Sequence, residues 1–103
     1  MLLVSSIVRL RHAWESRRRA RAHARRGQGF YQKSDFTGAI AEYEQSLEWR
    51  PDQPLIAFNL GLALYKAGRK TDARARWQAV LAQAETDNPY LAEQARMMLR
   101  QFG

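Results

Sequence analysis

The residues best suited to acid–base or metal chemistry are few and poorly placed for it. The two histidines, His12 and His23, each stand among arginines, and the chain has no cysteine. Glu42 and Glu44 lie two residues apart, a spacing that directs side chains to different faces of a helix. No nucleophile motif and no set of metal ligands accompanies them. The sequence therefore predicts a protein that is not an enzyme and that uses no metal or cofactor.

The arginines are suited to a different kind of chemistry, the binding of anionic groups. Residues 1–26 hold eight arginines and one acidic residue, Glu15, whereas residues 27–103 hold nine basic and nine acidic side chains. The net charge of +7 therefore belongs to the N-terminal quarter of the chain.

This quarter of the chain is predicted to begin as a basic amphipathic helix over residues 1–19. It has no glycine or proline, and a helix from about residue 5 is expected to continue into the segment that follows. One face holds Leu3, Ile7, Leu10 and Trp14, and the other faces hold a basic patch of Arg9, Arg11, Arg17, Arg18 and Arg19.

Three roles are compatible with this helix: packing over the rest of the chain or another subunit, contact with an anionic membrane, and nucleic-acid binding. Nucleic acid is the weakest of the three, because Trp14 alone is available there to stack on bases.

The location of the protein is expected to be cytoplasmic. The chain holds no run of about 18 apolar residues, and its apolar start lacks the preceding positive charges of a signal peptide. The basic helix is compatible with attachment to the periphery of a membrane. The alternative is that the apolar start is the end of a longer hydrophobic anchor.

A 34-residue period relates two segments of the chain, and a fixed period of this length predicts a repeat architecture. The identical pairs are Gly27 and Gly61, Tyr31 and Tyr65, Thr37 and Thr71, Ala39 and Ala73, and Leu47 and Leu81; Phe30 matches Leu64 and Tyr43 matches Trp77 in type.

Apolar residues at three- and four-residue spacing predict helices and no strands. After a helix that ends near Lys33, further helices are expected at about 37–50, 54–67, 71–84 and 89–101. Pro51 ends the second of these five helices, and Asn88 caps the last before Pro89.

The repeated residues resemble the tetratricopeptide-repeat (TPR) pattern. They are Gly27, Phe30, Ala39, Tyr43, Ser46 and Pro51 in the first repeat, and Leu60, Gly61, Leu64, Ala73, Trp77 and Val80 in the second. The resemblance implies an all-α fold, a right-handed superhelical array of antiparallel helix pairs. Residues 20–103 would form this domain, with repeat 1 at about 20–53, repeat 2 at about 54–87 and a capping helix at about 88–102.

In this family the first helices of the repeats line a concave groove for a peptide or helix of a partner protein. The corresponding positions here are Arg21, Ala24, Arg25, Gln28, Tyr31, Gln32, Leu55, Phe58, Asn59, Leu62, Tyr65 and Lys66. The resemblance gives Asn59 a particular role, because an asparagine at its place commonly binds the backbone of a peptide. Phe58, Leu62 and Tyr65 would form an apolar stripe in the groove, unless the N-terminal helix covers them.

The family's chaperone-binding members use a carboxylate clamp whose positions are taken here by Ala24, Gln28, Pro89 and Glu93. Binding of the acidic C-terminus of heat-shock chaperones is therefore disfavoured, although Arg21, Arg25 and Lys66 would still attract an acidic peptide.

The resemblance thus implies a protein-interaction module, whether a scaffold, a co-chaperone-like protein or a complex-assembly adaptor. The alternative is a binder of anionic membranes or nucleic acids that acts through the arginine-rich helix. Two repeats are few for such an array, so self-association into a homo-oligomer is also considered.

Overall fold

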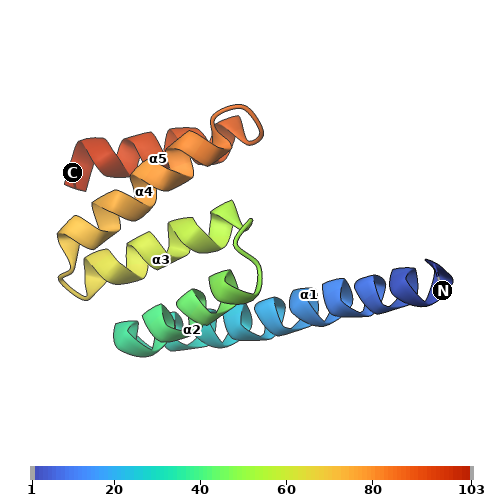
Figure 1. Ribbon diagram of the computed structural model, residues 1–103. Helices are drawn as coiled ribbons and strands as arrows, with labels where there is room; N and C mark the ends of the chain where they lie inside the picture. Colours follow the sequence, from blue (N-terminus) through green and yellow to red (C-terminus); the bar gives the residue numbers. More distant parts are fainter. Residues whose placement is uncertain (1, 103) are drawn as a thin grey trace.

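The computed structural model describes residues 2–102, so Met1 and Gly103 lie outside the described residues, as do the side chains of Leu2 and Leu3. In the described range, five α-helices follow one another and no strand occurs (Figure 1). They are α1 (Leu2–Gln32), α2 (Phe36–Trp49), α3 (Pro54–Lys66), α4 (Lys70–Ala84) and α5 (Pro89–Phe102). Each predicted helix is present, with ends that differ by only a few residues.

The helices are arranged as two antiparallel pairs and a final helix. Helix α1 packs on α2, α2 on α3, α3 on α4 and α4 on α5, so neighbours in the sequence are neighbours in space. The predicted all-α array of helix pairs is thereby confirmed. Helix α5 buries Leu91, Ala92 and Ala95 against the second pair, with Met98 and Leu99 partly buried beside them. It covers the flank that a capping helix was expected to cover.

Close approach within each pair depends on a glycine beneath an aromatic ring. A β-carbon at Gly27 would lie 2.7 Å from ring carbons of Tyr43, and a β-carbon at Gly61 would overlap the indole of Trp77. Ala39 is as fully buried in α2 as its repeat partner Ala73 is in α4. The 34-residue period therefore reflects the same small-against-large packing in both pairs.

The first helix of each pair ends in the same way. Ser34 has φ of +61° and Gly68 has φ of +86°, both in the left-handed region. In the first pair, the backbone N–H groups of Asp35 and Ser34 donate to the carbonyls of Phe30 and Tyr31. The second pair repeats both bonds at the equivalent positions. This double hydrogen bond is the Schellman arrangement, and only the second repeat has a glycine at its left-handed position.

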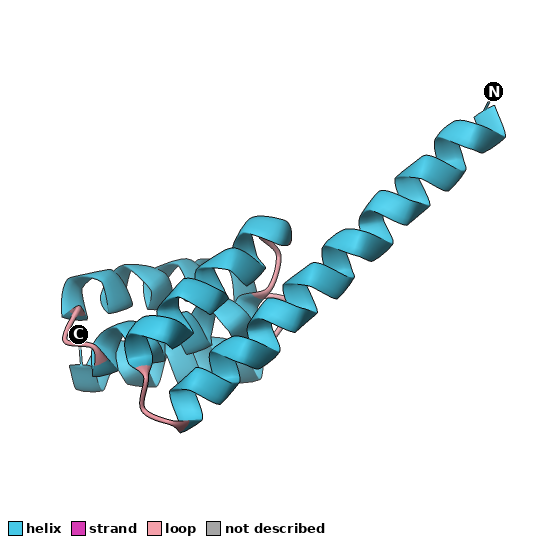
Figure 2. Ribbon diagram, turned by 90° about the horizontal axis from the view of Figure 1, so that it is seen from below, coloured by secondary structure: helices cyan, strands magenta, loops and turns pink. Residues whose placement is uncertain are grey.

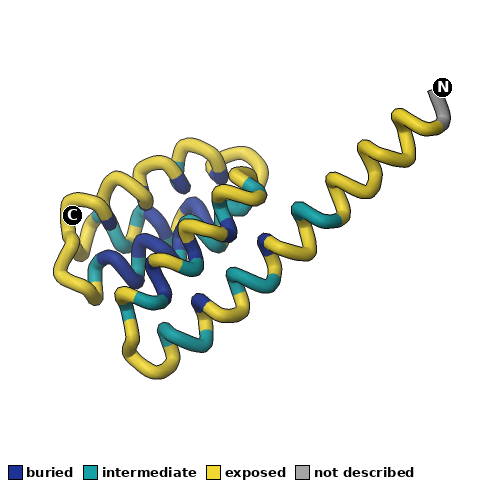
Figure 3. The backbone as a smooth tube through the Cα atoms, turned by 60° about the horizontal axis from the view of Figure 1, so that its bottom comes forward, coloured by how far each residue is buried: buried dark blue, intermediate teal, exposed yellow. Residues whose placement is uncertain are grey.

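Helix α1 is much longer than the others, and its N-terminal half projects from the body as a single rod (Figure 2). In the described side chains burial begins at Ala20, and those of residues 4–19 are exposed or partly exposed (Figure 3). The helix does not bend back over the groove. The first of the three roles considered for this segment was packing over the rest of the chain or another subunit. The first part of it, packing over the groove of the same chain, is not what the structure shows.

Candidate functional site

A hollow of about 460 Å³ lies between α1 and α3. Helix α1 contributes one wall and the N-terminal part of α3 the other. Its lining residues are Arg21, Ala24, Arg25, Gln28, Tyr31, Gln32, Tyr43, Leu55, Ile56, Asn59 and Leu62. Most of the residues that the sequence predicted for a groove thus come together at one place, although whether they bind a partner stays a prediction.

One of the differences between the two repeats lies at this hollow. Ala24 in α1 and Phe58 in α3 are one repeat period apart and so occupy the same place in their repeats. The small Ala24 leaves space between α1 and α3. The large Phe58 fills the corresponding space in the second repeat, where its ring lies 6.4 Å from that of Trp77.

Three of the predicted groove residues therefore lie elsewhere. Phe58 is only 8% exposed and belongs to the core, which corrects its placement in the groove. Tyr65 packs on the ring of Phe102 with centroids 4.6 Å apart, so α5 rather than the N-terminal helix covers this end of the stripe. Lys66 is exposed at the end of α3 and does not line the hollow.

The hollow combines an apolar floor with polar groups at its edges. Sequence reasoning missed the lining residue Tyr43, because it belongs to the second helix of its repeat and was named only as a residue of the repeat pattern. Burial raises the pKa of Tyr43 above its ordinary value, and the neighbouring Tyr31 adds to this effect. Arg21 and Arg25 stand exposed at the α1 edge. The Asn59 carboxamide takes part in no side-chain hydrogen bond found within residues 2–102.

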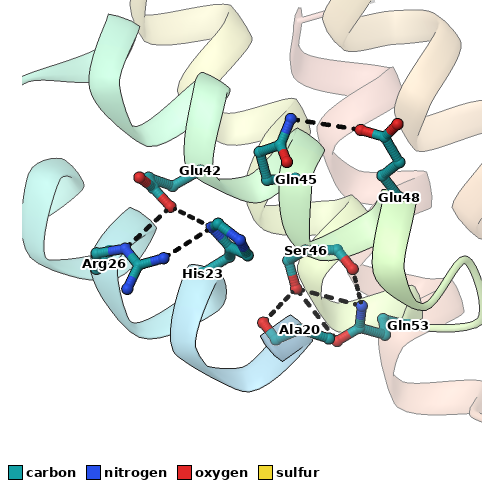
Figure 4. A network of polar contacts seen from close by, with 8 residues as sticks. All are labelled: Ala20, His23, Arg26, Glu42, Gln45, Ser46, Glu48 and Gln53. Atoms are coloured by element: carbon teal, nitrogen blue, oxygen red, sulfur yellow. Dashed lines mark hydrogen bonds and ion pairs between the residues drawn. The ribbon is translucent and has the colours of Figure 1, made fainter. Parts of the chain in front are cut away.

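The α1 wall is fixed to α2 by two polar clusters (Figure 4). In the first, the hydroxyl of Ser46 donates to the carbonyl of Ala20 at 2.7 Å, where burial of α1 begins. The amide of Gln53 in turn donates to the carbonyls of Ser46 at 2.9 Å and Arg50 at 2.6 Å. The Ser46 carbonyl also accepts the backbone N–H of Arg50 at 3.0 Å, so Gln53 adds a second bond to it and supplies a donor to the Arg50 carbonyl at the end of α2.

The second cluster joins His23 and Arg26 of α1 to Glu42 of α2. Glu42 Oε2 accepts hydrogen bonds from His23 Nδ1 at 2.7 Å and from Arg26 Nε at 3.3 Å. The bond from His23, supported by Arg26 and opposed by partial burial, lowers the pKa of Glu42 below its ordinary value. Glu42 was considered in the sequence only as half of an acid–base pair with Glu44, and no spacing along the chain indicates this contact between helices.

The predicted basic patch does not form a single surface. The guanidinium of Arg19 lies over the ring of Trp49 at 4.9 Å, toward α2. That of Arg18 lies over Trp14 of the projecting segment at 5.1 Å. Arg9, Arg11 and Arg17 are exposed on the rod itself.

Two further features of the described residues concern metal ions and membranes. Residues 2–102 hold no cluster of three or more histidine, aspartate or glutamate side chains suited to a metal ion. No helix in the same range is both long and apolar enough to cross a membrane.

Two stacked helix pairs with equivalent glycine–aromatic contacts and a hollow along their first helices define a helical-repeat protein. A family model described as a TPR repeat matches residues 27–68, and one described as a tetratricopeptide repeat matches residues 58–99. The chain belongs to the tetratricopeptide-repeat family, whose repeats are protein-interaction modules and are generally not enzymes.

One curated relative is the "Cytochrome c-type biogenesis protein CycH" of Bradyrhizobium diazoefficiens, which is 40% identical over 52 residues. The match covers 50% of this chain and 14% of that protein, so the chain corresponds to a small part of its relative. No solved structure matches the chain.

Proposed function

We propose that this chain is a non-enzymatic scaffold or assembly adaptor that binds a peptide or helix of a partner protein between α1 and α3. The observation that supports the proposal most directly is the hollow of about 460 Å³ with its apolar floor and polar edges. Such hollows bury the apolar side chains of a ligand, while a few polar groups fix its orientation.

Asn59 is the residue proposed to hold the backbone of the partner. Its carboxamide lines the hollow and offers a donor and an acceptor, which matches the N–H and C=O of a peptide unit. Arg21 and Arg25 at the opposite wall favour a segment with an acidic side chain near its bound apolar residue. The proposed partner is therefore a protein segment that combines one apolar and at least one acidic residue.

The role in assembly rests on the relative. The name of that protein refers to the biogenesis of c-type cytochromes. The segment that is similar to this chain is 52 residues long. We extend from it only the general role, that of an adaptor which brings proteins together during the assembly of a complex. We expect this binding to take place in the cytoplasm.

The test is the affinity of a partner captured with the full chain, measured by titration calorimetry. Asn59→Ala and Arg25→Gln should each weaken binding by about tenfold, a loss typical of a residue that contributes strongly to an interface. The matched controls are Gln78→Ala and Arg76→Gln, whose side chains are exposed on α4 away from the hollow. A partner that binds both groove variants as tightly as the unaltered chain would contradict the proposed site.

A further inference from the structure

Helix α1 packs on the rest of the protein along one face only. Ala20 and Gly27, seven residues apart, are its buried positions, beneath Ser46 and Tyr43 of α2. Seven residues correspond to almost two helical turns, so both positions lie on the same side of the helix. This inner face fixes the direction of every other side chain on the helix.

The opposite face of α1 forms a continuous outer stripe. At 100° per residue, Val4, Ile7, Arg11, Trp14 and Arg18 follow one another at three- and four-residue spacing and lie about 130–170° from the inner face. All five are exposed, with Val4 at 65%, Ile7 at 59% and Trp14 at 56%. Val8 and Leu10, also exposed, flank the stripe.

Large exposed apolar side chains are thus concentrated on the projecting part of α1. Five of the ten large hydrophobic side chains that are exposed in the described residues belong to the segment from Val4 to Trp14. Exposed apolar side chains in such a group indicate a surface that meets another apolar phase or molecule. The remaining question is what that phase or molecule is.

The charges around the stripe favour an anionic surface. Arg9 and Arg11 lie within the apolar segment, Arg17, Arg18 and Arg19 follow it, and Glu15 is the single acidic residue before position 35. The guanidinium of Arg18 lies 5.1 Å from the ring centroid of Trp14. Tryptophan and arginine together suit the boundary between lipid tails and headgroups, where the indole is half-immersed and the cation meets phosphate.

We infer that the outer stripe of α1 lies along the surface of an anionic lipid bilayer, with Val4, Ile7 and Trp14 at the level of the acyl chains and the flanking Leu10 beside them. The repeats, held on the inner face of the same helix, then stand on the water side. A fluid lipid surface adapts to the convex shape of a single exposed helix. A nucleic acid bound to the same stripe would place its charged phosphates against apolar side chains, so it fits the stripe less well than lipid does.

The experiment is co-sedimentation of the full chain with vesicles. Vesicles of phosphatidylcholine alone are compared with vesicles that also contain phosphatidylglycerol, at low and at high salt. Preferential binding to the anionic vesicles, weakened by salt, is expected. The emission of Trp14 should shift to shorter wavelength on binding, and this shift should be absent in Trp14→Phe. Equal binding to both kinds of vesicle, or no binding, would overturn the inference.

Two double variants separate the apolar contribution to binding from the contribution of the arginines. Ile7→Ser with Leu10→Ser should weaken binding to anionic vesicles by at least about tenfold. The reason is that serine replaces two apolar side chains that lipid would bury in the bound state. Arg11→Gln with Arg18→Gln should remove most of the preference for anionic lipid. These side chains are exposed, so circular dichroism should show the helical content unchanged.

Two controls link the result to this stripe. Leu55→Ser removes an exposed leucine of α3, and Asn59→Ala changes the proposed groove; both should leave vesicle binding intact. Failure of the groove proposal would therefore leave this one standing, and the reverse also holds. If sedimentation equilibrium shows that Ile7→Ser with Leu10→Ser abolishes a dimer while vesicles are ignored, the stripe pairs with a second copy and the inference is wrong.

Discussion

At the scale of single residues, the buried glycines decide how closely each helix pair approaches. Gly61→Ala should lower the free energy of unfolding by about 1–3 kcal/mol, because the new methyl group overlaps the Trp77 indole in a filled core. Gly27→Ala should act in the same direction against Tyr43. Urea denaturation followed by circular dichroism measures both changes.

Gly29 provides the matched control on the same helix as Gly27. A β-carbon there would meet no atom within 4 Å, so Gly29→Ala should raise the free energy of unfolding by about 0.5–1 kcal/mol through helix propensity alone. If all three alanine variants stabilised the protein, the glycine–aromatic contacts would not limit helix approach.

Glu42 should make stability depend on pH in the acidic range. Its pKa in the folded protein lies below the ordinary value of 4.5, so its contribution is fully present above about pH 4.5 and disappears as the pH falls through the lowered folded-state pKa. Glu42→Gln should cost about 1 kcal/mol at pH 7. The difference from the unaltered chain should shrink below pH 4.5.

Thermal denaturation of both proteins between pH 3 and pH 7 measures this effect. Glu48→Gln is the control, since Glu48 is exposed and its hydrogen bond is a local one from Gln45 at 3.3 Å. A constant difference between the Glu42 variant and the unaltered chain across this range would contradict the role given to the carboxylate.

At the scale of the helices, the two equivalent ends at Ser34 and Gly68 invite an exchange of residues. Ser34→Gly should stabilise the protein by about 0.5–1 kcal/mol, because a left-handed backbone costs glycine nothing, and Gly68→Ser should destabilise it by a similar amount. Chemical denaturation of the two variants and of the double exchange tests this. Two changes of the same sign would show that the ends are not equivalent.

Helix positions were predictable because each helix has local signals. Pro54 and Asn88-Pro89 mark the starts of α3 and α5, and Gly68 marks the turn after α3. The turn after α1 has no such glycine, yet Ser34 takes the left-handed conformation because the same pair of hydrogen bonds closes it. Local residue types therefore predict where helices begin and end. They do not predict which helix end places a residue other than glycine in the left-handed conformation.

The groove was only partly predictable, for a physical reason. The groove positions of the family identify which face of a helix lines the groove. This was sufficient to predict that Arg25, Gln28 and Asn59 line the hollow. Whether that face stays open depends on the size of side chains from other helices. Phe102 of α5 closes the part near Tyr65, a contact between residues far apart in the sequence that no local pattern encodes.

At the scale of the whole molecule, the projecting part of α1 makes the protein more extended than a compact domain of the same number of residues. The radius of gyration is 15.5 Å, with extents of 54 × 32 × 19 Å, whereas about 13 Å is typical of a compact domain of this length. Small-angle X-ray scattering on a dilute sample should therefore give a value near or slightly above 15.5 Å. A value as small as that of a compact domain would mean that α1 folds back, and a much larger one that the chain associates with itself.

The uninterrupted backbone of α1 has a geometrical consequence for any partner of the hollow. Ile7 and Gln28 belong to one rigid rod, with about 30 Å between them at roughly 1.5 Å per residue. Once the outer stripe is held on a bilayer, the groove loses most of its rotational freedom and keeps a fixed height and heading above the lipid. A tail of a protein embedded in the same bilayer then searches two dimensions instead of three, which raises its effective concentration at the groove without any new contact.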